Sequence, residues 1–363
     1  MQLSPVSTLR QWDAAFRSAP HSPQLTTEQL EELARAYYEG GSSASSSSGG
    51  GGTGGSAGEL PKDEAQAVAV WRAAAARGSI EAKYSLAVCL REGRGCAKDA
   101  VAARARLSEL AGDGNADGGD ADVGSGDDKK KRNKNVSNNK KGAGGYHLAH
   151  YALGIMLTSG EGGAPDHAKA FGHFKAAARA GVLPALHNLA NAYAAGRGVK
   201  QSDHNALLYY QAGADAGDPH AMFSLASWLH TGRGAADGKK QPERAFELNL
   251  AAARKGHPAA MFNVGAAFMS GVGTGSEGKD MGKAAGWFEK ASFEGTGRLA
   301  EASLNLGNMY RAGLVPGAGR DLVRAKAIFA RGAPFSKACA AALEQVVAEE
   351  HSPSTTAAGG GQG

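Results

Sequence analysis

One stretch of about thirty-six residues returns along most of this chain with substitutions, and it constrains the fold more than any other feature. Its clearest copy is VLPALHNLANAYAAGRGVKQSDHNALLYYQAGADAG, residues 182–217. Apolar residues such as Ala185, Leu189 and Tyr193 have the spacing of one helical face, and the glycines of AAGRG end that helix. A second apolar face follows and stops at Gly217. Each copy therefore predicts a helical hairpin.

The hairpins recur at a nearly constant spacing. Successive units close at glycines that lie 36 to 39 residues apart, at Gly181, Gly217, Gly256 and Gly295. In six of the second helices an alanine lies eleven residues before the closing glycine, and the residue four positions later on the same face is usually large and apolar. One unit departs from this pattern, because Asn249 lies there between Leu248 and Leu250. We expect its packing to be locally different.

Two low-complexity segments interrupt the array. GSSASSSSGGGGTGGSAG follows the first predicted helix, and a second segment is Gly/Asp-rich and then Lys/Asn-rich. Both carry too few apolar side chains to offset the entropy of ordering, so we predict disordered insertions at about residues 41–60 and 112–145. The predicted fold is all-α, an α/α superhelical solenoid of about seven helical-hairpin repeats over residues 25–350, followed by a disordered tail at residues 351–363.

The first 24 residues admit two interpretations. Leu9, Trp12 and Phe16 lie on one side of a short helix, which would cap the first repeat. The arginines and serines of the same segment instead favour a mitochondrial presequence, which Asp13 opposes. Both interpretations stay open.

Composition argues against several classes of protein. No stretch approaches the roughly eighteen consecutive apolar residues of a membrane span, and the N-terminus lacks the apolar region of a secretory signal. The three cysteines, Cys89, Cys96 and Cys339, are too few for a disulfide scaffold, which favours a reducing compartment. We expect a cytoplasmic protein, with a mitochondrial or nuclear location as the alternative. Six aspartates precede the basic run that begins at Lys129, so the net charge of +5 is spread thinly and we expect no nucleic-acid partner.

Several strings resemble catalytic or ligand-binding motifs but lack the setting that such motifs need. GTGSEGKD, residues 273–280, has the Gly and Lys of a phosphate-binding loop, but Asp280 replaces the hydroxyl residue and the loop follows a helix. GGSAG around Ser56 lies in a Gly/Ser tract with no strand before it. His147 and His150 have no nearby carboxylate or cysteine to complete a metal site. We therefore predict no enzymatic activity, no catalytic residue, no cofactor and no metal.

The hairpins resemble the Sel-1-like repeats, relatives of the tetratricopeptide repeats. The family pattern is close to A-x-x-x-L-G-x-x-Y-x-x-G-x-G-V, then a loop with Asp, then A-x-x-W-Y-x-x-A-A-x-x-G. It is matched in AHYALGIMLTSGEGG, in the copy at residues 182–217 and in AEASLNLGNMYRAG. The resemblance implies an α-solenoid whose first helices line a concave binding face.

The predicted function is that of a non-enzymatic adaptor or scaffold that binds partner proteins or peptides on the solenoid surface, with no small-molecule substrate and no membrane span. By analogy with tetratricopeptide arrays, polar residues two and five positions after the central Leu of a first helix should point into the binding face. These candidate partner-binding residues are Arg91, Asn191, Ser227, His230, Asn308 and Arg311.

The family resemblance also implies two alternatives. One is a component of endoplasmic-reticulum-associated degradation, which the missing signal peptide and membrane anchor oppose. The other is a β-lactamase-like hydrolase related to cysteine-rich members of the family. Cys89 and Cys96 have the spacing of the cysteine pairs in those members, but the pair occurs in one repeat only.

Overall fold

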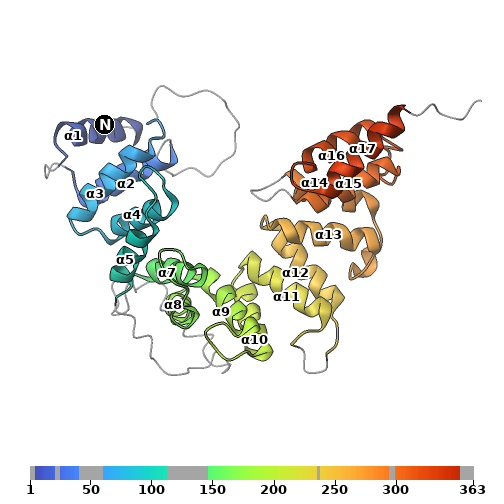
Figure 1. Ribbon diagram of the computed structural model, residues 1–363, viewed down its shortest axis with the longest axis horizontal. Helices are drawn as coiled ribbons and strands as arrows, with labels where there is room; N and C mark the ends of the chain where they lie inside the picture. The colour runs from blue at the N-terminus through green and yellow to red at the C-terminus, as the bar shows by residue number, and fades with distance from the viewer. Residues whose placement is uncertain are drawn as a thin grey trace, which may run out of the picture. The chain divides into compact units, whose positions relative to one another are not determined.

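The computed structural model describes residues 5–20, 25–40, 60–112, 146–234, 238–293 and 299–351, and every regular element in these ranges is a helix. The chain divides into two compact units. The first contains residues 1–185 and 196–200, and the second contains residues 186–195 and 201–363. Within each unit, consecutive helices follow one another as packed hairpins (Figure 1). The predicted all-α array of hairpin repeats is confirmed.

The first unit holds one single helix and three hairpins. The single helix is α1 (Pro5–Ser18), and the hairpins are α2 (Thr27–Glu39) with α3 (Glu64–Ala76), α4 (Ile80–Glu92) with α5 (Ala100–Ala111), and α7 (His147–Ser159) with α8 (His167–Arg179). Adjacent hairpins also touch, because α3 packs on α4 and α5 packs on α7. The apolar faces are thus buried against the neighbouring hairpin as well as within the same one.

The second unit continues the same pattern. Its helices are α9 (Leu183–Ala195), which begins at the unit boundary, α10 (Asp203–Asp215), α11 (Pro219–Thr231), α12 (Pro242–Arg254), α13 (Pro258–Ser270), the short 3₁₀ helix η1 (Gly275–Glu277), α14 (Met281–Phe293), α15 (Ala300–Arg311), α16 (Leu322–Gly332) and α17 (Lys337–His351). The last helix, α17, packs on both α15 and α16 and covers the end of the array.

Helix α1 packs on α2. Leu9 and Phe16 are buried in the same apolar cluster as Leu30 and Leu33 of α2, with Trp12 partly buried against it. This is the contact that a capping helix requires. The presequence interpretation of the same residues stays a prediction.

Most of the predicted insertions and tail lie outside the described residues. The exceptions are the boundary residues Leu60, Gly112 and His351. Leu60 is buried, and Gly112 caps the C-terminus of α5, so these two belong to the repeats themselves.

The same backbone hydrogen bond closes every described hairpin. The residue that precedes the second helix donates its N–H to a carbonyl near the end of the first helix. The seven donors are Asp63, Asp99, Asp166, Ser202, Gln241, Asp280 and Asp321, with N···O distances of 2.8 to 3.0 Å. Asp280 is the final residue of GTGSEGKD, and its carboxylate also accepts from the N–H of Lys283 at 2.8 Å. It is a helix cap in an inter-helix loop, which explains why an aspartate stands there.

One position of the second helix fills the interior of each hairpin. Six hairpins carry a buried large apolar residue at this position, namely Trp71, Leu107, Phe174, Tyr210, Phe288 and Phe329. The ring often lies against a glycine of the first helix, since a Cβ added to Gly265 would come within 2.9 Å of the Phe288 ring. Close packing of this kind fills the space between the two helices at the level of that residue.

Candidate functional site

Two of the six candidate residues are arginines that bind other parts of the same unit. The Arg91 guanidinium donates from Nε to Oε2 of Glu161 at 2.5 Å and from a terminal nitrogen to Oε1 at 3.1 Å. This pairing holds the pKa of Glu161 below its ordinary value. Arg311 donates to Gln345 at 3.0 Å and to Glu349, both on α17. These arginines therefore link α4 to the loop after α7 and α15 to the last helix.

Asn191 is exposed on α9, but its amide is also engaged. Its Oδ1 accepts from the hydroxyl of Tyr210 at 2.5 Å, and its Nδ2 lies 3.4 Å from Nε2 of His187. Asn191 thus fixes the aromatic residue that fills its own hairpin.

The remaining three candidates, Ser227, His230 and Asn308, are exposed. Within the described part of the chain their side chains make no hydrogen bond or ion pair. Asn308 lies on α15, whereas Ser227 and His230 lie together on α11 at the rim of a hollow. The structure therefore brings two of the six predicted residues to one candidate site.

That hollow, called here the α11–α13 groove, lies among α11, α12 and α13 and has a volume of about 490 Å³. Its apolar lining consists of Ala226, Pro242, Ala245, Phe246, Ala266, Ala267 and Val272. Val272 is 51% exposed, which is high for an aliphatic side chain. No lysine, arginine, aspartate or glutamate lines the groove, so its lining is apolar with Ser, Asn and His side chains as its polar groups.

Asn249 and Asn263 supply the other polar groups of the groove. Asn249 takes the hairpin-filling position of α12 and is only 9% exposed. Its Oδ1 accepts from Nδ2 of Asn263 at 3.4 Å. The repeat pattern marks Asn249 as a departure from the other repeats but does not place it in a site. Its signal was the absence of the large apolar residue found at that position in other repeats.

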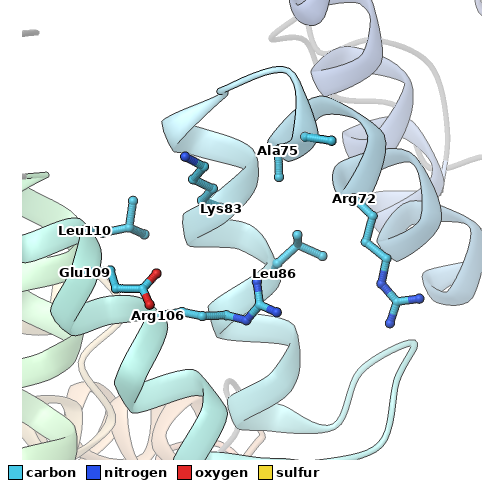
Figure 2. A pocket seen from close by; sticks show the side chains of 8 residues that line it. Arg72, Ala75, Lys83, Leu86, Arg106, Glu109 and Leu110 are labelled. Carbon is cyan, nitrogen blue, oxygen red and sulfur yellow. The ribbon is translucent and has the colours of Figure 1, made fainter. Parts of the chain in front are cut away.

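A second hollow, of about 370 Å³, lies among α3, α4 and α5 in the first unit. Figure 2 shows Arg72 on α3, Lys83 on α4, and Arg106 and Glu109 on α5 around it. Among the described residues the three cations have no ion-pair partner. All four charged side chains are exposed, so this hollow is a basic surface patch above the apolar side chains of Leu86 and Leu110.

Histidine rings lie close together in both units, buried in the first unit and partly or fully exposed in the second. His150 and His173 are buried with their Nδ1 atoms 2.9 Å apart, and burial together with the charge of His150 lowers the pKa of His173 to about 4. His220 and His257 have ring centroids 4.8 Å apart. In the parts of the chain that the structure covers, no group of three or more His, Cys, Asp and Glu side chains could hold a metal ion.

The profile of the Sel1 repeat matches this chain seven times, at residues 52–79, 80–105, 147–182, 183–218, 219–257, 258–292 and 300–333. The chain belongs to the Sel1 repeat family. The matches confirm the resemblance seen in the sequence. The first match begins at residue 52 and therefore omits α2. In the structure α2 nevertheless packs on α3, as the first helix of a hairpin does in the other repeats.

Comparison with individual proteins agrees with this assignment. The Sel1 repeat protein is 34% identical over 129 residues to the chitin synthase regulator SKT5 of Saccharomyces cerevisiae, a match that spans 35% of this chain and 18% of that protein. A Sel1 repeat protein from Oxalobacter formigenes has a similar structure, with a TM-score of 0.58 and 23% identity, over 88% of this chain and 76% of that chain. The similarity to the Oxalobacter formigenes structure shows the fold alone.

The protective antigen c5321 of uropathogenic Escherichia coli, which displays an SLR fold, matches with a TM-score of 0.37 and 21% identity over 95% of this chain and 76% of that chain. No helix in the described ranges of the Sel1 repeat protein has both the length and the apolar character needed to cross a bilayer.

Proposed function

We propose that this Sel1 repeat protein is a non-enzymatic adaptor that holds a partner protein or peptide on the exposed surface of its repeats. The α11–α13 groove is the observation that carries the proposal. There, Ser227 and His230 are exposed at the rim of a hollow with an apolar lining, as in the polar rim and apolar centre of a protein interface. Sel1 repeat proteins generally mediate protein–protein interactions, and the relative from yeast is named a regulator.

The repeat residues themselves are committed to the interior. The large residues of the second helices and the small residues opposite them are buried, so they build the scaffold and are not available to a partner. Partner recognition therefore falls to the residues that vary between repeats. For this reason we place the binding surface at Ser227 and His230 and count Asn308 as a further exposed candidate on α15.

No observation favours the two alternatives from the family. In a hydrolase of the cysteine-rich kind, Cys89 and Cys96 would be paired, but both are free thiols here. Burial raises the pKa of Cys89 to about 11, so its nucleophilic thiolate form is scarce at neutral pH. Nothing in the described residues points to a component of endoplasmic-reticulum-associated degradation.

Affinity capture with quantitative mass spectrometry tests the adaptor proposal. The tagged full chain is compared with a double variant, Ser227→Glu with His230→Glu, and with Ala330→Glu, a matched control on the exposed face of α16. We expect at least one partner whose recovery falls about tenfold with the double variant, because two carboxylates added at the edge of an apolar groove lose water when a partner docks. The same partner should be retained by Ala330→Glu. Failure of any protein to exceed the untagged background would contradict the adaptor function.

A further inference from the structure

The α11–α12 hairpin lacks the residue that fills the other hairpins. Its hairpin-filling position holds Asn249, and the first-helix residue opposite is Ala226. The α9–α10 hairpin also has an alanine in the first helix, Ala190, yet there the buried Tyr210 fills the space. Ala226 and Asn249 both line the α11–α13 groove. The groove therefore adjoins the place that a ring takes in the neighbouring repeat.

The size of the groove suits an inserted side chain. Its volume of about 490 Å³ lies within the range of about 300–1,000 Å³ typical of ligand-binding pockets. Phe246 and Val272 belong to its lining, and Val272 is half exposed. An apolar group placed there would remove this surface from water, which is the main driving force of association.

Asn249 gives the groove a directed polar group. The residue is 9% exposed and lines the groove. Its Oδ1 accepts from Asn263, and within the described residues its Nδ2 makes no hydrogen bond and is open to solvent, since Asp218 Oδ2 is the buried side-chain atom without a partner there. The amide of an asparagine matches the donor and acceptor of a peptide unit, so a bound peptide can accept from the Nδ2 group that otherwise faces water.

The chemistry of the lining identifies the kind of partner. A charged ligand would find no counter-charge, because no residue with a formal charge lines the groove. An extended peptide sends alternate side chains to one side while its main-chain amides stay available for hydrogen bonds. Such a segment can place one apolar side chain in the hollow and pair its backbone with Asn249. Ser227 and His230 at the rim can then bond the flanking peptide groups.

We propose that the α11–α13 groove binds one uncharged, extended peptide segment, with an apolar side chain in the hollow and a backbone amide hydrogen-bonded to Asn249. This inference rests on the proposed adaptor function and names the place and the chemistry of its partner.

A peptide selection tests the site. Random twelve-residue peptides displayed on phage are selected on the full chain, and the best binder is synthesised for fluorescence anisotropy. Its affinity is then measured for wild type, Asn249→Tyr, Asn263→Ala and the control Ala330→Glu. The variant Asn249→Tyr copies the neighbouring hairpin and places a ring in the inner part of the hollow. We expect it to weaken binding at least tenfold with an unchanged or higher melting temperature, and Ala330→Glu to bind as wild type.

The peptide itself supplies a second measurement. Replacing its apolar anchor by alanine should also weaken binding about tenfold, and the selected sequences should share an apolar residue and carry little charge. The site proposal is overturned if no peptide is selected, if the selected peptides depend on charged residues, or if Asn249→Tyr binds as tightly as wild type.

The outcomes separate the two proposals. One outcome is a peptide that no longer binds the double variant Ser227→Glu with His230→Glu but still binds Asn249→Tyr. This outcome would overturn the Asn249 site and leave the adaptor function standing. Peptides that behave as expected, combined with an affinity capture that recovers no protein, would uphold the site and count against the adaptor function.

Discussion

The fold lowers the pKa values of two histidines, the buried His173 and the partly buried His257, to about 4. His257 caps α13, since its Nδ1 accepts from the N–H of Ala260 at 3.2 Å, and its ring stacks on Phe223 with centroids 4.6 Å apart. Burial and then the charges of His220 and His187 lower the pKa of His257 to about 4, while Asp218 opposes this shift. The neutral form is therefore the one that the folded state prefers.

The direction of the pH effect follows from that shift. The pKa of His257 is lower in the folded than in the unfolded state, so stability is full above about pH 6.5 and falls as the pH drops toward 4. Because His257 is only partly buried, we expect a loss of about 1 kcal/mol between pH 7 and pH 5. His257→Asn keeps a capping side chain and removes the titration.

Thermal melts at pH 7 and pH 5 check this prediction. The difference between the two melting temperatures should be smaller in His257→Asn than in wild type, and it should be unchanged in His230→Asn, whose ring is exposed. An identical pH dependence in His257→Asn and wild type would show that His257 is not the group responsible.

At the scale of elements, the loop between the two helices of a hairpin packs on the start of the second helix of the preceding hairpin. Gly273 has a φ of +77°, and a Cβ added to it would lie 2.4 Å from the carbonyl oxygen of Pro242, the first residue of α12. Gly95 approaches the carbonyl of Glu64 in the same way. The second glycine of the GxG loops is therefore required by packing between repeats as well as by its backbone conformation.

Alanine substitutions within one loop separate these two requirements. Gly275 also has a positive φ, of +57°, but a Cβ there would meet nothing within 4 Å. We expect Gly275→Ala to cost about 1 kcal/mol from backbone strain alone, and Gly273→Ala to cost at least about 3 kcal/mol, because α12 must also move away. Urea unfolding of both variants measures the difference. Equal losses would mean that the loop does not support α12.

The sequence allowed much of each element to be predicted. The spacing of Leu189 and Tyr193 fixed the face of a first helix, and the aspartate of GTGSEGKD was rightly interpreted as part of a loop. The hydrogen-bond partners of the candidate side chains were harder to predict. Glu161, the partner of Arg91, lies 70 residues away, and the residues that hold Arg311 belong to a helix outside the repeat pattern. Periodicity assigns a residue to a face but does not say which distant group meets it there.

In the molecule as a whole, the repeated residues build the fold and the non-repeated residues form the candidate site. The seven matched repeats account for the fold, and their shared residues are buried. The candidate site instead depends on Asn249, the residue that breaks the pattern, and on Ser227 and His230 beside it. The repeat pattern marks such a residue only as an exception, because the hollow beside it is formed by three helices together.

Hydrogen–deuterium exchange of the full chain, with and without the best peptide from the selection, tests this account most directly. The account predicts slower amide exchange in α11, α12 and α13 on peptide binding, with no change in the first unit and no protection in Asn249→Tyr. Protection confined to the basic hollow around Arg72 and Lys83, or protection that persists in Asn249→Tyr, would contradict it.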